Sequence, residues 1–318
     1  MTDSLPDKRE QLMKEKTFFS KLAKNIKMHK GLYLIAIPIV LYYIVFAYYP
    51  MYGVQIAFRD YTPKKGIWGS DWVGLAHFKS FVNSVFFGRV VKNTISINLK
   101  NLIIGFPLPI IFALLLNEIK LPRFKKTVQT FSYMPHFVST VVIAGMILQF
   151  TATEGFITKF LTLFGYPQKN LLLDPDMFQP IYVLSDIWQG LGWDSIIYIA
   201  AIAGVNAELY EAARIDGAGS FKQICHVTIP GIIPVIITMF ILRVGGLLSM
   251  GFEKIILLYN PSVYETADVI SSYVYRKGLL EQSYSFSTAV GLFNSLVNLA
   301  LLIIANKLCK RLTETSLW

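Results

Sequence analysis

Six apolar segments alternate with polar ones along the chain, and each contains few charged residues. They are Leu32–Pro50, Thr94–Asn117, Phe137–Phe150, Ile181–Val205, Ile232–Met250 and Ala289–Ala305. A helix needs about 20 mostly apolar residues, within a range of about 17–25, to cross a bilayer. Five segments reach this length, and the third does so if residues 131–136 are included. The pattern predicts an all-α integral membrane protein with six transmembrane helices.

Composition agrees with this class. Of the 318 residues 54% are hydrophobic and 16% are charged, whereas a soluble protein carries about 25% charged residues. The net charge is +10, but the basic residues flank the apolar segments and form no separate soluble domain. Binding to nucleic acid is therefore disfavoured, and binding to anionic lipid is favoured.

The basic residues predict the orientation of the chain. Residues 1–30 hold eight Lys or Arg and four Asp or Glu. Further basic residues crowd the expected short loop between the second and third helices and the tail after the last helix: Lys120, Arg123, Lys125, Lys126, Lys307, Lys310 and Arg311. Loops rich in Lys and Arg stay in the cytoplasm. We expect both termini to be cytoplasmic in a multi-pass protein of the cell membrane.

A polar segment, Asn206–Pro230, separates the fourth and fifth apolar segments and is longer than a connection requires. Asn206 is a suitable N-cap for a first short helix. Gly217 can adopt the positive φ that turns the chain. Ser220 and Gln223 have the spacing of a capping box for a second helix, which Pro230 would end. We expect a helix–turn–helix that serves as a docking surface.

The first of these short helices predicts a close contact with a partner. Leu209, Ala212 and Ala213 share one face, where the small alanines allow another surface to approach. An alternative interpretation is purely local: Glu211 would pair with Arg214 three residues on, which stabilises a helix by about 0.2–0.5 kcal/mol. Spacing alone does not decide between the two.

The run Glu211-Ala-Ala-Arg-Ile-Asp-Gly-Ala218, followed by Ile229-Pro230, closely resembles the EAA loop of permease subunits in binding-protein-dependent ABC importers. Further stretches resemble the carbohydrate branch, in particular permeases for oligosaccharides from complex polysaccharides: Asn93-Thr94, Leu116-Asn117-Glu118, Tyr133-Met-Pro-His-Phe137 and Thr315-Ser-Leu-Trp318. The resemblance covers nearly the whole chain from about Gly31. It implies a type I importer fold and uptake of a sugar or oligosaccharide.

The resemblance also implies a role for the EAA loop at 206–230. This loop would be a cytoplasmic coupling helix between helices four and five, seated in a cleft of an ATPase subunit. Its coupling residues would be Glu211, Ala212, Ala213, Asp216, Gly217 and Pro230. Glu211 would face a basic residue of the ATPase, Ala212 and Ala213 would pack against it, and Gly217 would supply the bend.

The expected partners follow from the same resemblance. They are a second homologous permease, usually in a heterodimer, two cytoplasmic ATPase subunits and an extracellular solute-binding protein. The chain has no G-x-x-x-x-G-K-[ST] phosphate loop. We therefore expect a transport subunit without an enzymatic site, with ATP and Mg²⁺ bound by the partner ATPases and no cofactor bound by this chain.

Four parts are expected along the chain. Residues 1–30 form a basic cytoplasmic arm, and residues 31–92 hold the first transmembrane helix and an extracellular loop. Residues 93–308 form the permease core with helices two to six, and residues 309–318 form a cytoplasmic tail.

Charged residues inside the apolar segments should face the interior of the helix bundle or a wet cavity, and three of them, Asp186, Asp194 and Arg243, are candidates for the substrate path. Lys100, Asp186, Asp194 and Arg243 lie there, and an isolated charge costs about 2.5–3.5 kcal/mol on insertion scales. The densest polar run is Asp186 to Asp194, which includes Trp188, Gln189 and Trp193. Aromatic faces and polar groups together are typical of sugar sites. Alternatively, either aspartate pairs with Arg243 or caps a broken helix.

Two further sets of residues are weaker candidates for this path. Asn294 and Asn298 share a helix face, where they could line the cavity or join helices by hydrogen bonds. Phe252-Glu253 and Tyr259-Asn260 could form an outer gate.

Two other functions compete with an importer. A secondary transporter driven by an ion gradient would show inverted repeats and matched broken helices, and we find no such repeat. A membrane-embedded enzyme would need an acid or metal cluster. The four histidines, at 29, 77, 136 and 226, lack metal-ligand spacing, so no metal site is predicted.

Overall fold

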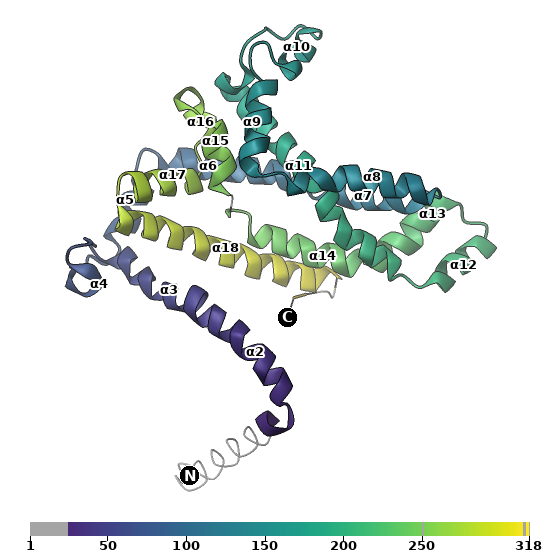
Figure 1. Cartoon of the computed structure of the whole chain (residues 1–318), viewed down its shortest axis with the longest axis horizontal. Helices are drawn as coiled ribbons and strands as arrows, with labels where there is room; N and C mark the ends of the chain where they lie inside the picture. The colour runs from purple at the N-terminus through teal and green to yellow at the C-terminus, as the bar shows by residue number, and fades with distance from the viewer. Residues whose placement is uncertain (1–24, 250, 314–315, 318) are drawn as a thin grey trace. The chain divides into compact units, whose positions relative to one another are not determined.

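The computed structural model describes residues 25–249, 251–313 and 316–317. The chain forms two compact units, Met1–Gln55 and Ile56–Trp318. The described residues form helices and no strand (Figure 1); their one extended pairing is an isolated antiparallel bridge between Arg59 and Trp72. The predicted all-α class is confirmed.

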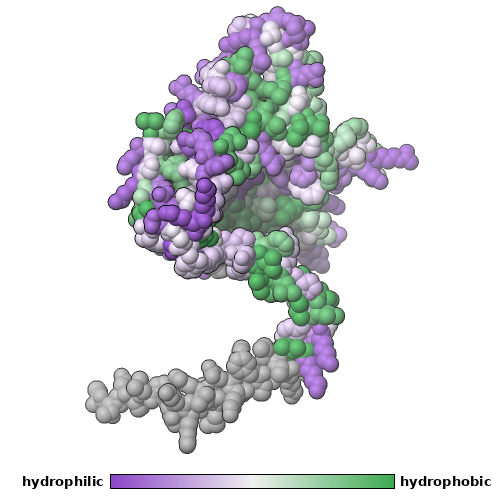
Figure 2. Space-filling view, turned by 60° about the vertical axis from the view of Figure 1, so that its left-hand side comes forward, coloured by the Kyte–Doolittle hydropathy of each residue, from purple (hydrophilic) through white to green (hydrophobic). Residues whose placement is uncertain are grey.

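The described part of the first unit is one apolar helix. It comprises α2 (Lys30–Tyr43), a π-helical turn (Ile44–Tyr48) and α3 (Tyr49–Met51), and continues as a 3₁₀ helix (Tyr52–Phe58). No residue of α2 is buried, and Leu34 is 73% exposed. Figure 2 shows hydrophobic side chains over much of the surface of this helix. Such a helix requires lipid or another chain around it. Residues 1–24 of the predicted basic arm lie outside the described residues.

Four helices are long and apolar enough to cross a membrane: Lys30–Phe58, Phe87–Glu118, Ser220–Gly245 and Tyr284–Arg311. Two pairs of consecutive helices are also long and apolar enough when the helices of each pair are counted as one span. In the first pair, Pro122–Phe137 and Thr140–Phe150 meet at a bend of 99°; in the second, Pro175–Ala203 and Ala207–Ile215 meet at a bend of 70°. The described residues thus contain four candidate spans, or up to six if each bent pair is one span. The predicted count of six remains a prediction.

The second and third apolar segments are each built from two helices. The second contains α6 (Phe87–Lys100), a π-helical turn (Asn101–Gly105) and α7 (Pro107–Glu118). The third contains α8 (Pro122–Tyr133), a 3₁₀ turn (Met134–Phe137) and α9 (Thr140–Phe150).

The prediction that the basic residues between these two segments lie in a short loop is wrong for three of them. Arg123, Lys125 and Lys126 lie in α8 and not in a loop. The helix begins early because Pro122 occupies its first turn, where a missing N–H costs nothing and the fixed φ suits a helix.

The fourth segment begins beyond a folded loop. That loop contains α10 (Phe156–Thr162) and a 3₁₀ turn (Leu171–Leu173). Asp174 then caps α11 (Pro175–Ala203) by accepting a hydrogen bond from the Asp176 N–H. The remaining elements to the end of the fifth segment are α12 (Ala207–Ile215), α13 (Ser220–Gln223), a π-helical turn (Ile224–Thr228) and α14 (Ile229–Gly245).

Short helices fill the two remaining polar stretches. Those of the first loop are α4 (Gly66–Gly69) and α5 (Ala76–Val82). Between the fifth and sixth segments lie α15 (Phe252–Leu258), a 3₁₀ turn (Pro261–Val263), α16 (Tyr264–Ala267), α17 (Ile270–Tyr275) and a π-helical turn (Arg276–Leu280). The last helix, α18 (Tyr284–Thr313), runs beside α14 (Figure 1).

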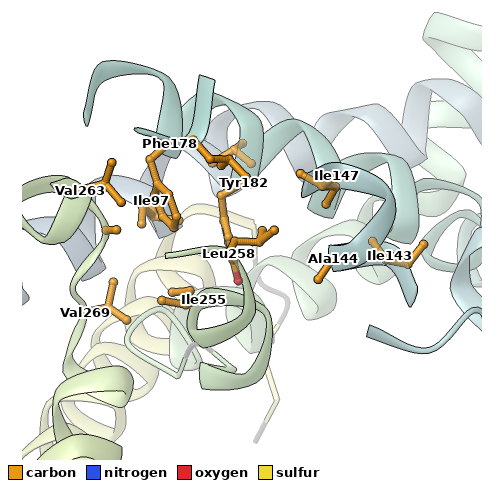
Figure 3. Close-up of a cluster of buried hydrophobic side chains, with 13 residues drawn as sticks. Ile97, Ile143, Ala144, Ile147, Phe178, Tyr182, Ile255, Leu258, Val263 and Val269 are labelled. Carbon is orange, nitrogen blue, oxygen red and sulfur yellow. The ribbon is translucent and has the colours of Figure 1, made fainter. Parts of the chain in front are cut away.

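Buried apolar side chains form three clusters in the second unit. The largest joins α6, α9, α11 and α15, and Figure 3 shows Ile97, Phe178, Tyr182, Ile255 and Leu258 within it. A second cluster surrounds Phe81 of α5, and a third joins α7, α11 and α14. These clusters fix α11 between its neighbours, so the polar residues of α11 are held in defined positions.

Candidate functional site

The first half of the predicted docking surface has the local structure that the sequence predicts. The Asn206 side-chain oxygen accepts a hydrogen bond from the Glu208 N–H at 3.0 Å and so caps α12. At the other end Gly217 has a φ of +76°. The Ala218 N–H donates to the Ala213 carbonyl at 2.8 Å, and the Gly217 N–H donates to the Arg214 carbonyl at 3.0 Å. This is a Schellman turn, which requires a residue that tolerates positive φ.

The second half differs from the prediction in two ways. Ser220 does not cap α13: the N-cap is Gly219, without a side-chain bond, and the Gln223 side chain donates to the Ala218 carbonyl at 2.7 Å. Pro230 does not end the helix, because one continuous helix runs from Ser220 to Gly245. Pro230 lies in the first turn of α14, directly after a π-helical turn. Such irregular turns accommodate a missing N–H inside a helix.

The surface of this element is apolar and exposed. Leu209 is 52% exposed, Phe221 is 78% exposed and Ile215 is 87% exposed. Ala212, Asp216 and Pro230 are exposed as well, and Ala213 is half-buried. The Tyr210 hydroxyl lies 3.0 Å from the Thr228 hydroxyl, which ties α12 to the following helix. The element is thus held in place while its apolar side chains remain uncovered within the chain.

The carboxylate of Glu211 has no ion pair with Arg214, although both residues lie in the described range. The local interpretation of this pair is therefore wrong. Both side chains are exposed, so the Glu211 carboxylate is available to another molecule.

A cavity of about 530 Å³ lies against α11. Four of the predicted substrate-path residues line it: Asp186, Gln189, Asp194 and Arg243. A smaller cavity of about 310 Å³ shares Asn101, Asp186 and Arg243 with it. The two are called the central cavity below.

Polar contacts connect the walls of the central cavity. Arg243 donates to the Asn101 side-chain oxygen at 3.2 Å, and the Asn101 amide donates to Asp186. In the alternative interpretation an aspartate pairs with Arg243; the structure connects Asp186 to Arg243 only through Asn101. The Lys254 ammonium lies 3.7 Å from the other Asp186 oxygen and 3.5 Å from the Gln189 side-chain oxygen. Lys254 is 6% exposed, so its ammonium is shielded from water, whereas the Asp186 side chain is 36% exposed.

Five of the predicted substrate-path residues do not line the central cavity. Trp188 is 49% exposed, and Glu253 is exposed on α15, whereas its neighbour Lys254 is buried. Trp193 stacks on the ring of His136 at 4.4 Å, and His136 is the residue that lines the wall.

The asparagines of α18 join helices. Asn298 donates to the Ser249 hydroxyl at 2.8 Å and accepts from the Leu248 N–H at 2.9 Å. Asn294 donates to the Leu248 carbonyl at 3.2 Å. Of the two roles open to them, the contacts support the joining of α18 to the residues after α14.

Sequence reasoning missed Asn101, Lys254 and His136. Asn101 carried a signal, because it is an amide beside Lys100 within an apolar segment. Lys254 carried none, since it lies in a polar stretch where a lysine is unremarkable in sequence. No group of three or more His, Cys, Asp or Glu among the described residues could hold a metal ion.

The sequence of this chain is similar to those of known transport proteins. The family model for the binding-protein-dependent transport system inner membrane component matches residues 105–314. The chain is 43% identical to the polygalacturonan/rhamnogalacturonan transport system permease protein YteP of Bacillus subtilis (strain 168), over 94% of this chain and 93% of that protein. It is also 43% identical to protein LplB of the same organism, over 92% of both chains.

Two solved structures share the fold. One is a chain of a bacterial ABC transporter involved in the import of the acidic polysaccharide alginate, with a TM-score of 0.83 and 41% identity over 92% of this chain and 99% of that chain. The other is a chain of a bacterial alginate ABC transporter in complex with an alginate pentasaccharide-bound periplasmic protein. It has a TM-score of 0.84 and 40% identity, over 93% and 100% of the two chains.

Proposed function

Because the chain belongs to the family of inner membrane components of binding-protein-dependent transport systems, we propose that it is the permease subunit of an ATP-driven importer for a sugar or oligosaccharide. An extracellular solute-binding protein delivers the substrate. A second permease completes the pathway, and two cytoplasmic ATPase subunits supply the energy. The names of the relatives and the binding protein in one solved complex support these roles.

The observation that carries the proposal is the exposed surface of α12. A capped helix ends in a Schellman turn at Gly217 and presents uncovered Leu209 and Ile215 together with an unpaired Glu211. Exposed apolar groups rimmed by polar ones mark surfaces that bind another protein. A cleft on an ATPase with a basic residue opposite Glu211 would cover this surface. Closure of the ATPases would then move α12 and, through the short connection at 204–206, α11.

Movement of α11 would change the central cavity. Asp186, Gln189 and Asp194 are all on α11, whereas Asn101, Arg243 and Lys254 lie on other elements. A displacement of α11 would therefore break the Asp186–Asn101 and Asp186–Lys254 contacts. We assign the central cavity to the sugar, whose hydroxyls would exchange hydrogen bonds with these groups.

Substitutions in the docking surface test the proposal. Glu211→Lys reverses the charge that would meet the ATPase, and Gly217→Val places a β-branched residue at positive φ. Both should abolish ATP-driven uptake and reduce co-purification of the ATPase, while the chain still inserts into the membrane. Gly219→Ala is the matched control, because Gly219 has open space around it and an ordinary φ of −69°. Normal uptake in both Glu211→Lys and Gly217→Val would contradict the coupling role.

A further inference from the structure

A cavity of about 470 Å³, separate from the central cavity, lies between α6, the first turns of α11 and α16. Arg89, Lys92 and Lys100 of α6 line it. Their spacing of three and eleven residues places them on one face of the helix. From Gly88 to Lys100 this wall extends over roughly 18 Å. We call this cavity the α6 groove.

Lys100 lies inside a candidate span and has no counter-ion among the described residues. It belongs to the apolar helix Phe87–Glu118, where an unpaired charge is costly and usually functional. Its ammonium donates to the Gln179 side-chain oxygen at 2.6 Å and pairs with no carboxylate among the described residues. Gln179 is fixed by Ser96 and by the Thr266 carbonyl. This amide positions Lys100 but leaves its charge uncompensated.

Lys92 and Arg89, the other two cations of the groove, can also form further interactions with an anion. Lys92 is exposed and, within the described residues, forms no ion pair. Arg89 pairs with Asp268 at 3.2 Å, but Asp268 is shared with Arg276. One carboxylate thus serves two guanidinium groups. In addition, the Nε atom of Arg89 is buried and has no hydrogen-bond partner. An unsatisfied buried donor favours a ligand that accepts hydrogen bonds.

Two carboxylates line the same groove and must be weighed against the cations. Asp176 and Glu265 are both exposed and make no ion pair with the three cations. Asp176 is in the first turn of α11, where the helix dipole already stabilises its charge. With Asp268 and Arg276 included, the surroundings of the groove hold four cationic and three anionic side chains. Lys100 is exposed and lies on the cationic wall.

We propose that the α6 groove binds the carboxylate groups of an acidic oligosaccharide, so that the imported sugar contains uronic acid units. This inference rests on the proposed function and specifies its substrate class. Cations along one wall match a chain that carries an anion on successive rings, and charge-assisted hydrogen bonds are the strong ones. Relatives named for polygalacturonan and for the acidic polysaccharide alginate agree with this chemistry.

The groove and the central cavity share one side of α11. Gln179 faces the groove and Asp186 faces the central cavity, and seven residues separate them. Seven residues are two helical turns, so the two side chains share a face at a separation of roughly 10 Å. Tyr182 and Val183, between them, are 5% and 3% exposed and belong to the cluster of Figure 3. Tyr182 also lines the smaller part of the central cavity, so the groove and the cavity are adjacent along α11.

The test uses the complete transporter, reconstituted with its partner subunits and solute-binding protein. The probe is a galacturonate oligomer, and its carboxyl-reduced neutral counterpart is the comparison. The variants are Lys100→Gln, Lys100→Arg and, as a control outside the groove, Lys79→Gln, which changes an exposed lysine of α5. We expect Lys100→Gln to lower uptake of the acidic probe about tenfold, the effect of one charge-assisted hydrogen bond. Lys100→Arg and Lys79→Gln should stay near wild type.

Three outcomes would overturn the inference. In the first, the wild-type transporter imports the neutral oligomer but not the acidic one. In the others, Lys100→Gln imports the acidic probe at the wild-type rate, or Lys100→Arg is as impaired as Lys100→Gln. Repeating the assay in phosphatidylcholine vesicles distinguishes a sugar carboxylate from an anionic lipid headgroup. The Lys100→Gln defect should persist there, and its disappearance would assign the groove to lipid. Absence of ATP-dependent uptake for both oligomers would instead reject the proposed function.

Discussion

Both terminal nitrogens of Arg276 donate to the carboxylate of Asp268, at 2.8 and 3.0 Å. The Asp268 side chain is fully buried and also accepts from Ser272 at 2.9 Å and from Arg89 at 3.2 Å. This carboxylate therefore holds α6 against the segment that contains α16 and α17. Removal of one member of a buried ion pair leaves the others charged without compensation, which is strongly destabilising.

Asp268→Asn should thus lower the free energy of unfolding by about 3–5 kcal/mol. Thermal unfolding in detergent would measure this as a large fall in Tm. Asp71→Asn is the control, because Asp71 pairs with Lys65 at 3.7 Å and both side chains are largely exposed. Such a pair contributes about 0–1 kcal/mol. Equal effects of the two substitutions would contradict the role given to Asp268.

Gly192 permits a close approach between α8 and α11. A β-carbon there would lie 2.1 Å from the Ser132 carbonyl oxygen. Gly192→Ala should therefore force the helices apart and cost about 1–3 kcal/mol. Gly145→Ala, in α9, has open space around it and should be neutral or slightly stabilising, since glycine weakens a helix interior. Comparison of the two melting temperatures checks this, and a stable Gly192→Ala would contradict the close packing.

The Lys254–Asp186 pair should show energetic coupling across the central cavity. Asp186→Asn leaves the buried ammonium without its partner, and Lys254→Met removes that ammonium. The double variant should therefore lose less stability than the sum of the single ones, with a coupling of about 0.5–3 kcal/mol. Unfolding measurements on the four proteins give this value. Strict additivity would show that the 3.7 Å contact contributes nothing.

The carboxyl of Asp174 should titrate at an unusually low pH. The hydroxyl of Tyr166 and then the ammonium of Lys169 donate to it and lower its pKa from 3.8 to about 2. A folded-state pKa below the ordinary value means that these contacts stabilise the loop fully above pH 3.8, and that this stabilisation is lost as the pH falls toward 2.

Tyr166→Phe removes the largest cause and should raise the Asp174 pKa toward 3.8. Carboxyl bands in infrared difference spectra, with Asp174→Asn to assign the signal, would measure the shift. An unchanged titration in Tyr166→Phe would show that the hydroxyl does not hold the Asp174 carboxylate.

Local signals in the sequence predicted much of the docking surface. The caps at Asn206 and Gly217 depend on neighbouring residues only, so the sequence sufficed. The prediction for Pro230 was wrong because a proline usually ends a helix. Here a π-helical turn before Pro230 keeps the helix continuous, and no residue pattern in the sequence indicates that turn.

The central cavity was predictable only in part. Helical spacing and polarity identified Asp186, Gln189, Asp194 and Arg243. The position of Lys254 depends on how α15 packs against α11, a contact between segments about 65 residues apart in the chain. For the same reason Trp188 and Trp193 looked alike in the sequence, yet only Trp193 stacks on a residue of the cavity wall.

This chain should transport a sugar only as part of a complex driven by ATP. The most direct measurement is uptake of labelled oligosaccharide into vesicles that contain the reconstituted complex, with ATP and the solute-binding protein each present or absent. We expect uptake only when both are supplied, without dependence on a proton or sodium gradient. Uptake driven by an ion gradient alone, without ATP or binding protein, would contradict it.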